Sequence, residues 1–278
     1  MSATPNASTF NNEDVNDSEN ISVESLDCAF TLDEICNTIS SMSRHKSCDI
    51  SGNVADFFID AKMFIAPYLV TIFNHIFDNG IYPEAWTKGV IVPIHKKGDK
   101  TNPSNYRGIT LVNVIAKIFS LTLRNRINNW CETEDKLNDA QFGFRDSRST
   151  VDCIYILHTV IQKVLAQKQK LYCAFIDYEK AFDTVIHDAL WIKLVQSGIS
   201  SKMLTMLKSL YANVKACVKD MNTMLYSELF DISLGVKQGE PLSPLLFIMF
   251  INDIRDYLDF ENLTQNDINK LSLYMLVN

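Results

Sequence analysis

The chain has 278 residues, 47% of them apolar and 21% charged, so it is long enough and apolar enough to bury a substantial core. Its formal net charge of −7 argues against a protein that is basic throughout, but residues 1–43 hold eight acidic residues and no lysine or arginine. The remainder is close to neutral. Seven cysteines without a CxxC pair and five scattered histidines argue against a His/Cys zinc site.

The sequence shows no signal peptide, and its longest clean apolar run, Leu245 to Ile251, is far too short to span a membrane. Cysteines placed in apolar runs fit a reduced compartment. We therefore expect an intracellular protein, nuclear or cytoplasmic, with no membrane association.

The first elements in chain order are an acidic leader and a helical extension. Residues 1–27, rich in Asn, Ser, Asp and Glu, predict a disordered acidic leader. Thr31 and Glu34 are spaced as a capping box for a helix through about Ser41. An amphipathic helix is predicted over 61–78, ending near Asn79-Gly80. Residues 28–85 are therefore expected to form a helical N-terminal extension.

The next segment predicts a strand at 89–94 (GVIVPI), a polar loop with Gly and Pro punctuation at 95–108, and a helix at 111–130. This part of the chain is unusually basic. Such a local excess is what a nucleic-acid backbone would attract, and the alternative is a solvated basic face. Residues 88–126 hold eight basic side chains against only Asp99: Lys88, Lys96, Lys97, Lys100, Arg107, Lys117, Arg124 and Arg126.

A long helix capped by Ser149 or Thr150 is predicted next, followed by an apolar strand, Leu171 to Ile176, that ends at Asp177. The residues expected on the buried face of the helix are Val151, Ile154, Leu157, Ile161 and Val164.

Two helices are predicted at 187–197 and 201–212, followed by an alternating strand at 227–236. After the turn at Lys237-Gln238-Gly239, an apolar helix is predicted from about Leu242 to Leu258. Helices segregated around a small antiparallel sheet imply an α+β fold. The strand residues expected to share one face are Phe230, Ile232, Leu234 and Val236.

Asp177 is the first candidate for chemistry because it stands where an apolar strand ends. A lone Asp in such a place is usually a turn or cap residue. Phosphoryl transfer would instead use it as a hard oxygen ligand for magnesium on a rigid edge. Asp183 could be a second ligand, although a structural hydrogen bond is the more ordinary role.

Several motifs resemble the reverse transcriptases of non-LTR (LINE-type) retrotransposons. FIDYEKAFDTV, from Phe175, resembles the first carboxylate motif of that family, and GVKQGEPLSPLLFIMFINDI, from Gly235, resembles its Gln-Gly and Leu-Ser-Pro segment. WTKGVIVPIHKKGD and NYRGITLVNVIAKI, from Trp86 and Asn105, and QFGFRDSRST, from Gln141, resemble its fingers segments. The motifs occur in the family's order over about residues 80–258. The resemblance implies a right-hand polymerase, with fingers at 86–170 and a partial palm at 171–278.

Site residues follow from the resemblance. Asp177 would be the catalytic Mg²⁺ ligand, with the backbone carbonyl of Tyr178 assisting. Phe182 would exclude a ribose 2′-hydroxyl, or be a core aromatic. Gln238 and Gly239 would lie near the templating pair, at a turn before a helix. The basic residues implied for nucleotide binding are Arg145, Arg107 and Lys96, and those implied for nucleic-acid binding are Lys88, Lys97, Lys100 and Arg148.

The sequence departs from the family at two places. Glu240 adds an acid beside Gln238-Gly239, at a position that we regard as variable. The expected Tyr/Phe-Ala-Asp-Asp hairpin is missing, and LSLYMLVN stands where it should begin. We therefore expect a palm truncated before the hairpin, and an incomplete, inactive RNA-directed DNA polymerase whose partners would be an RNA template, a DNA primer and deoxynucleotides. The alternative is a non-catalytic remnant that binds RNA or an RNA–DNA hybrid, and a third hypothesis is a decayed reading frame.

Overall fold

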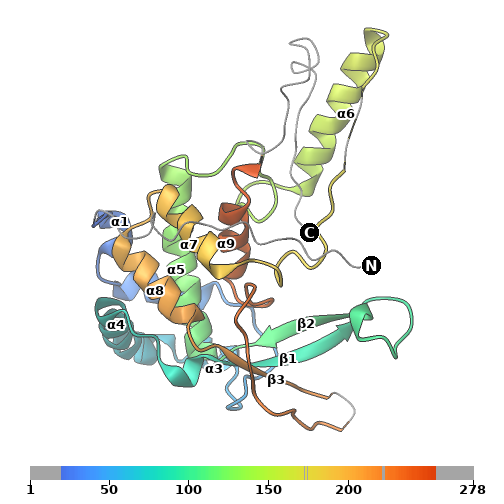
Figure 1. Ribbon diagram of the computed structural model, residues 1–278. Helices are drawn as coiled ribbons and strands as arrows, with labels where there is room; N and C mark the ends of the chain where they lie inside the picture. Colours follow the sequence, from blue (N-terminus) through green and yellow to red (C-terminus); the bar gives the residue numbers. More distant parts are fainter. Residues whose placement is uncertain (1–19, 172, 174, 221–222, 255–278) are drawn as a thin grey trace.

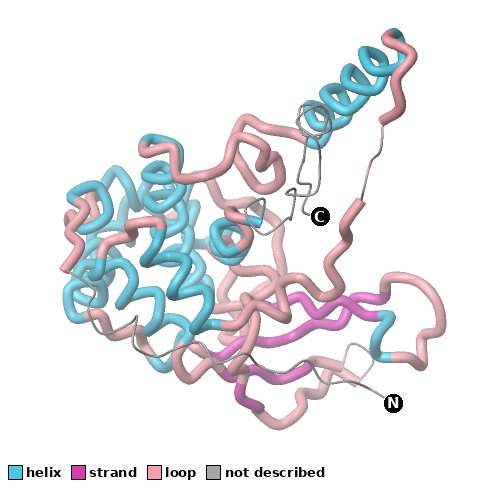
Figure 2. Tube along the Cα trace, turned by 45° about the horizontal axis from the view of Figure 1, so that its top comes forward, coloured by secondary structure: helices cyan, strands magenta, loops and turns pink. Residues whose placement is uncertain are grey.

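The computed structural model describes residues 20–254 except 172, 174 and 221–222. A body of packed helices lies beside a small sheet, and one long helix projects away from both (Figures 1 and 2). This mixed arrangement confirms the α+β class. In the described part of the chain, no helix is both long and apolar enough to cross a membrane.

The N-terminal helices begin and end largely where the sequence predicts. The Thr31–Glu34 capping box is formed, with the Glu34 amide 3.2 Å from the Thr31 hydroxyl. Gly80 ends the fourth helix in a left-handed conformation with φ +65°, which glycine adopts without strain. The four helices are α1 (Glu24–Asp27), α2 (Leu32–Ser40), α3 (Ala55–Asp60) and α4 (Lys62–Asn79).

The prediction of a disordered leader through residue 27 is wrong at its end. Residues 24–27 form α1, and Leu26 is fully buried in the core. The Asp27 carboxylate accepts hydrogen bonds from the Val23 amide at 3.0 Å and from the Ser200 hydroxyl at 2.5 Å. Ser200 lies 173 residues further along the chain, so the composition of the leader could not predict this contact.

Helix α5 (Val114–Thr133) is the centre of the helical body. Its Phe119 is fully buried, and the ring lies 5.0 Å from Phe73 and 5.9 Å from Phe30. Edge-to-face aromatic pairs of this kind add to the stabilisation from burial. The helix starts later than predicted because Tyr106–Leu111, assigned to a loop and the helix start, form a strand instead.

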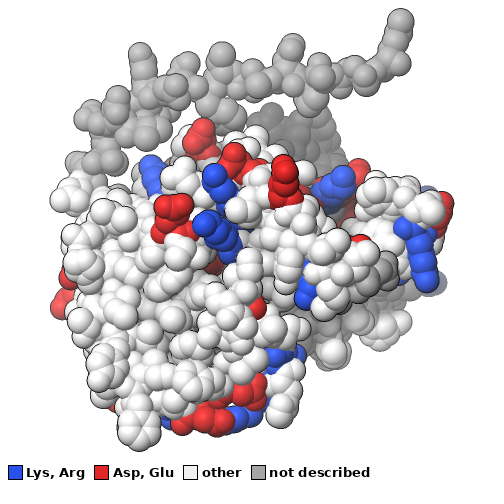
Figure 3. All heavy atoms as spheres, turned by 90° about the horizontal axis from the view of Figure 1, so that it is seen from below, with Lys and Arg blue, Asp and Glu red and all other residues white. Residues whose placement is uncertain are grey.

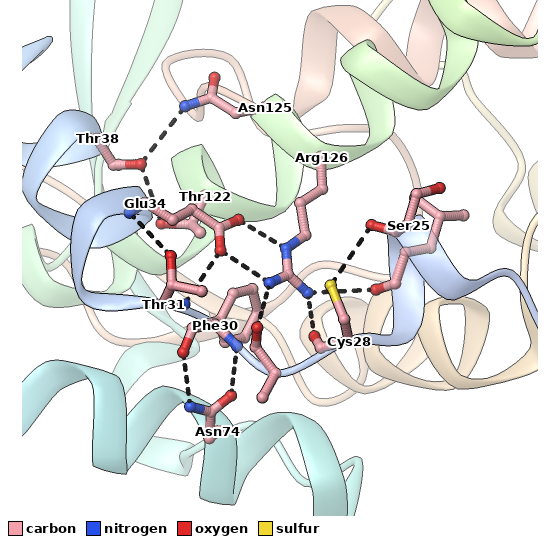
Figure 4. Close-up of polar contacts among 12 residues, drawn as sticks. Ser25, Cys28, Phe30, Thr31, Glu34, Thr38, Asn74, Thr122, Asn125 and Arg126 are labelled. Atoms are coloured by element: carbon pink, nitrogen blue, oxygen red, sulfur yellow. Dashed lines mark hydrogen bonds and ion pairs between the residues drawn. The ribbon is translucent and has the colours of Figure 1, made fainter.

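Arg126 of the basic stretch is a structural residue of this core (Figure 4). Its guanidinium lies 2.6 Å from Glu34 in an ion pair, donates to the carbonyls of Leu26, Cys28 and Ala29, and stacks 4.0 Å from the Phe30 ring centre. Because the side chain is only 7% exposed, it ties α5 to the N-terminal helices and is not available to a phosphate.

The sheet has four strands in the order β2-β1-β3-β4. The β1–β2 and β3–β4 pairs are antiparallel, but β1 pairs in parallel with β3, so Val90 lies between Leu111 and Cys217. The prediction of a purely antiparallel sheet is therefore wrong. The alternating strand predicted at 227–236 is also reduced to two residues. The strands are β1 (Lys88–His95), β2 (Tyr106–Leu111), β3 (Lys215–Val218) and β4 (Phe230–Asp231).

Helix α6 (Thr150–Ala166) forms where predicted, with Ser149 and Asp152 in a capping box, but its predicted buried face is wrong. Val151 and Ile154 are 69% and 62% exposed, and only Val164 of the five predicted residues is buried. Figures 1 and 2 show the reason, since the helix projects away from the body and no described element packs along it.

The strand predicted at 171–176 is not formed in its described residues, and Phe175 is 85% exposed. No strand described in the chain lies beside it, and a strand without a neighbour leaves its backbone groups unpaired.

The remaining helices are α7 (His187–Gln196), α8 (Ser201–Tyr211) and α9 (Ser243–Phe250), and short 3₁₀ turns span Glu84–Trp86 and Pro103–Asn105. The predictions for α7 and α8 are confirmed. Helix α9 ends earlier than predicted, and residues 255–258 of that prediction lie outside the described residues. The segments assigned to the extension, fingers and palm contribute to one core, so the domain boundaries at 86 and 171 stay predictions.

Candidate nucleotide and nucleic-acid site

The bend at Gln238-Gly239 packs directly on strand β2. The Gln238 carbonyl accepts a hydrogen bond of 2.7 Å from the Thr110 amide. Gly239 has φ +109°, and a Cβ at this position would meet the Thr110 carbonyl oxygen at 2.6 Å. Glycine is therefore required here both by the backbone conformation and by the close approach to β2.

The same bend is hydrogen-bonded to the Ala-Phe-Asp motif. The Val236 amide donates to the Phe182 carbonyl at 2.8 Å, and the Gln238 side-chain amide donates to the Asp183 carboxylate at 3.2 Å. Gly235 has φ +84°, and a Cβ at this position would lie 2.8 Å from the Phe182 carbonyl oxygen. Asp183 therefore has the structural hydrogen-bonding role that the sequence favoured.

His187 contacts the backbone just before the Gln-Gly bend, and the sequence did not predict this contact. Its Nε2 lies 2.8 Å from the Gly235 carbonyl, and its ring packs 5.2 Å from that of Tyr211. The histidine at the start of α7 therefore holds the backbone before the Gln-Gly bend. No local signal marks it, because its partner lies 48 residues further along the chain.

The Phe182 ring joins the QFGFR segment to helix α9. It stacks on Phe247 of α9 with the ring centres 5.1 Å apart, and Phe144 of the QFGFR motif meets it edge-on at 6.0 Å. The ring is half-buried. It is thus both part of the core and partly open to solvent, so the two readings of this residue are compatible.

Asp177 and Tyr178 are exposed residues of an irregular segment rather than of a strand end. Hard-cation sites in proteins need several oxygen ligands held in a fixed arrangement. Among the described residues, no group of three or more His, Cys, Asp or Glu side chains could hold a metal ion. The described residues therefore do not bring three such side chains together around Asp177.

Glu240, which follows the bend, is buried with only 4% exposure. Burial raises the pKa of its carboxyl, and Lys237 and a hydrogen bond with Ser120 lower it to a smaller extent. Its Oε2 has no hydrogen-bond partner in the described structure. The sequence shows that an acidic residue stands here, but it does not predict that the residue is buried. The burial depends on the packing of α5 and α8 around the bend.

Arg145 and Arg148 are engaged within the protein. Arg145 is 6% exposed, forms a two-point ion pair with Glu132 at 2.7 and 3.0 Å and donates to the Asn138 carbonyl at 3.0 Å. Arg148 pairs with Asp139 at 2.9 Å. Both contacts order the loop before α6, which gives these arginines a structural role.

The basic residues of the β1–β2 hairpin are placed differently. Lys96, Lys97, Lys100 and Arg107 are exposed and form no ion pair within the described chain, and Lys88 is half-buried on β1. Figure 3 shows Lys and Arg next to Asp and Glu on the face of the molecule seen from below. The hairpin loop is therefore the part of the basic stretch best placed to meet phosphates.

Comparison with known proteins decides the family. The family model for the reverse transcriptase (RNA-dependent DNA polymerase) matches residues 94–275, which is more than half of the chain. This chain belongs to the reverse transcriptase family. Its relatives include the probable RNA-directed DNA polymerases from transposons BS and X-element of Drosophila melanogaster. The first is 33% identical over 225 residues and the second 30% over 238.

These reverse transcriptases, and that of the mobile element jockey at 27% identity, place the chain with non-LTR retrotransposons, as the sequence predicts. The matches cover 80%, 82% and 86% of this chain but only 24%, 25% and 26% of the relatives. Among solved structures, an apo telomerase from Candida tropicalis matches with a TM-score of 0.44 and 15% identity, covering 77% of this chain and 46% of that one.

Proposed function

We propose that this reverse transcriptase domain binds an RNA template, paired with a DNA primer, and an incoming deoxynucleotide at the Gln-Gly bend, as part of an RNA-directed DNA polymerase. The observation that carries the proposal is the convergence of separate motifs at this bend. Thr110 of β2 and the Phe182–Val185 stretch are both hydrogen-bonded to residues 235–238, and Phe144 packs on Phe182. Gly239 lies against Thr110 and Gly235 against Phe182 and Asp183, so the backbone of residues 235–239 joins these segments.

The close approach of Gly239 to β2 fixes the position of the bend, and the template base would lie against the bend in this position. The Phe182 ring would then limit the room for a ribose 2′-hydroxyl. The exposed lysines and Arg107 of the hairpin would hold the nucleic-acid backbone, which makes binding depend on salt. Mg²⁺, with Asp177 and the Tyr178 carbonyl as ligands, stays a prediction from the family, whose members use divalent metal ions.

The test is binding of a dye-labelled RNA template annealed to a DNA primer, measured by fluorescence anisotropy with the next complementary deoxynucleotide present. Gly239→Ala should weaken binding by at least fivefold, about 1 kcal/mol, because the new methyl group pushes the bend away from β2. Gly198→Ala is the matched control, since Gly198 also has a positive φ of +83° but its nearest neighbour, the Lys136 ammonium, is 3.8 Å away. Equal losses in both variants would show that the bend does not contact the nucleic acid.

A second candidate function is RNA or hybrid binding without chemistry. It is favoured by the irregular, exposed segment around Asp177, which does not hold this residue on a rigid edge. Both functions predict salt-dependent RNA binding, and only the first predicts tighter binding when the correct deoxynucleotide is added to the primed template.

A further inference from the structure

A hollow of about 250 Å³ lies at the end of β2, where Gly239 approaches this strand. It is lined on one side by the segment before α3, including Lys46, Cys48 and Asp49, and on the other by the end of β2 and the first turn of α5, including Lys117. Gly239 itself is part of the wall. Lys46 and Asp49 come from the chain upstream of residue 94, where the family match begins.

The charge of the hollow is positive, although an aspartate lines it. The Asp49 carboxylate is buried and accepts hydrogen bonds from the amides of Ser51, Asn53 and Val114 at 2.8, 2.9 and 3.0 Å. A fourth bond, of 3.3 Å, comes from the Asn53 side chain. The carboxylate therefore stabilises the loop and the start of α5, and its acceptor capacity is used within the protein.

The two lysines have no such partner. Within the described residues neither Lys46 nor Lys117 forms an ion pair or a side-chain hydrogen bond. Burial lowers the pKa of Lys117, and the neighbouring Lys46 ammonium lowers it further. Two lysines that line one hollow, and whose charges are close enough to repel each other, are stabilised by an anion bound there.

We propose that the Lys46–Lys117 hollow binds one phosphate group of the nucleic acid or nucleotide held at the Gln-Gly bend. The hollow and the bend share Gly239, so a phosphate in the hollow lies next to whatever contacts the bend. The site as an anion site is independent of catalysis, and the source of the phosphate rests on the proposed function. That source is either the polynucleotide backbone or a nucleoside triphosphate. In the first case the two lysines contribute to RNA affinity, and in the second they contribute to deoxynucleotide affinity.

The experiment compares the double variant Lys46→Gln/Lys117→Gln with Lys208→Gln, which removes one exposed lysine on α8. Affinity is measured for a 12-nucleotide RNA and, separately, for dGTP at several KCl concentrations. A backbone site predicts about fivefold weaker RNA binding and a salt slope smaller by about 0.7 in the double variant, as expected for one lost phosphate contact on a single strand. A triphosphate site predicts the loss for dGTP alone. Affinities that match those of Lys208→Gln for both ligands would overturn the proposal.

Cys48 gives a second measurement that does not depend on the lysine variants' stability. It is an exposed free cysteine in the wall of the hollow. In the unchanged protein, the bound RNA or dGTP should slow maleimide labelling of Cys48 severalfold, whereas labelling of Cys28, also exposed, should not change. Peptide mass mapping separates the two sites. Unprotected Cys48 at saturating concentrations of both ligands would contradict a phosphate in the hollow.

Discussion

At the scale of single residues, the same side-chain type serves opposite purposes in different surroundings. Arg126 and Arg145 are enclosed by carboxylates and carbonyls, whereas Lys96 and Arg107 stand in solvent. A count of basic residues along the chain cannot separate these cases, because the partners Glu34 and Glu132 are acidic residues outside or beyond the basic stretch. The predicted phosphate-binding role of the stretch therefore does not extend to Arg126, and the hairpin residues and Lys117 are the ones that we propose to meet phosphates.

Arg126 provides a direct prediction at this scale. Arg126→Met should lower the free energy of unfolding by about 3 kcal/mol, because Glu34 and three carbonyls lose a buried partner. Arg124→Gln is the matched control on the same helix, where the Asp146 partner is 62% exposed and the loss should stay below about 1 kcal/mol. Urea unfolding followed by circular dichroism measures both, and comparable losses would show that the Arg126 cluster is not structural.

Glu240 predicts a pH dependence of stability. Because its pKa is raised in the folded protein, its contribution to stability is fully present below the unfolded value of about 4.5 and is lost as the pH rises toward the folded pKa. The groups that face it are Lys237, Tyr82, Tyr211 and Ser120.

Compared with the unchanged protein, Glu240→Gln should therefore gain stability with rising pH from about 4.5 upward. The gain should be at most about 1.4 kcal/mol for each pH unit. Urea titrations at pH 5, 6, 7 and 8 measure the difference between the two proteins. A difference that is constant over this range would show that Glu240 is charged in the folded state throughout.

At the scale of elements, local signals predict helices well and their surroundings poorly. Three helix-end signals depend only on neighbouring residues, and all three are formed. They are the capping boxes at Thr31 and Ser149 and the glycine that ends α4 at Gly80. The prediction of a strand at 171–176 is wrong because a strand depends on a pairing partner elsewhere in the chain. Strand β2 was missed for a similar reason, since its pairing with β1 overrides the loop-like composition before it.

Helix α6 carries the prediction at this scale. Ile154→Gln should change the free energy of unfolding by less than about 0.5 kcal/mol, because the side chain is already 62% exposed. Val164→Ala on the same helix removes buried methyl groups and should cost about 1 kcal/mol or more. The two variants are compared by urea unfolding. A larger loss for Ile154→Gln than for Val164→Ala would mean that the apolar face of α6 is covered after all.

At the scale of the whole molecule, the site is assembled by contacts between distant segments. The family and the motifs that form the Gln-Gly site could be predicted from the sequence, because motif identity is local. The burial of Glu240, the His187 contact and the Lys46–Lys117 hollow could not, because each joins residues from at least two elements that meet only in the folded chain.

The RNA affinity of the Asp177→Asn variant is the prediction at this scale. Asp177→Asn should leave RNA affinity unchanged or slightly higher, because it removes a negative charge near phosphates. Fluorescence anisotropy with a labelled RNA measures the affinity, and a large loss in a folded variant would contradict the placement of Asp177 near phosphates.

The parallel pairing of β1 with β3 has a consequence for biosynthesis. Val90 emerges from the ribosome long before Cys217. One edge of β1 in the β1–β2 hairpin therefore stays unpaired until β3 has been synthesised. An uncovered edge can pair with another nascent chain. Pairing between segments so far apart is also slow, because a large loop must close first. Expression at low temperature or with a chaperone that covers strand edges should therefore increase the yield of folded protein.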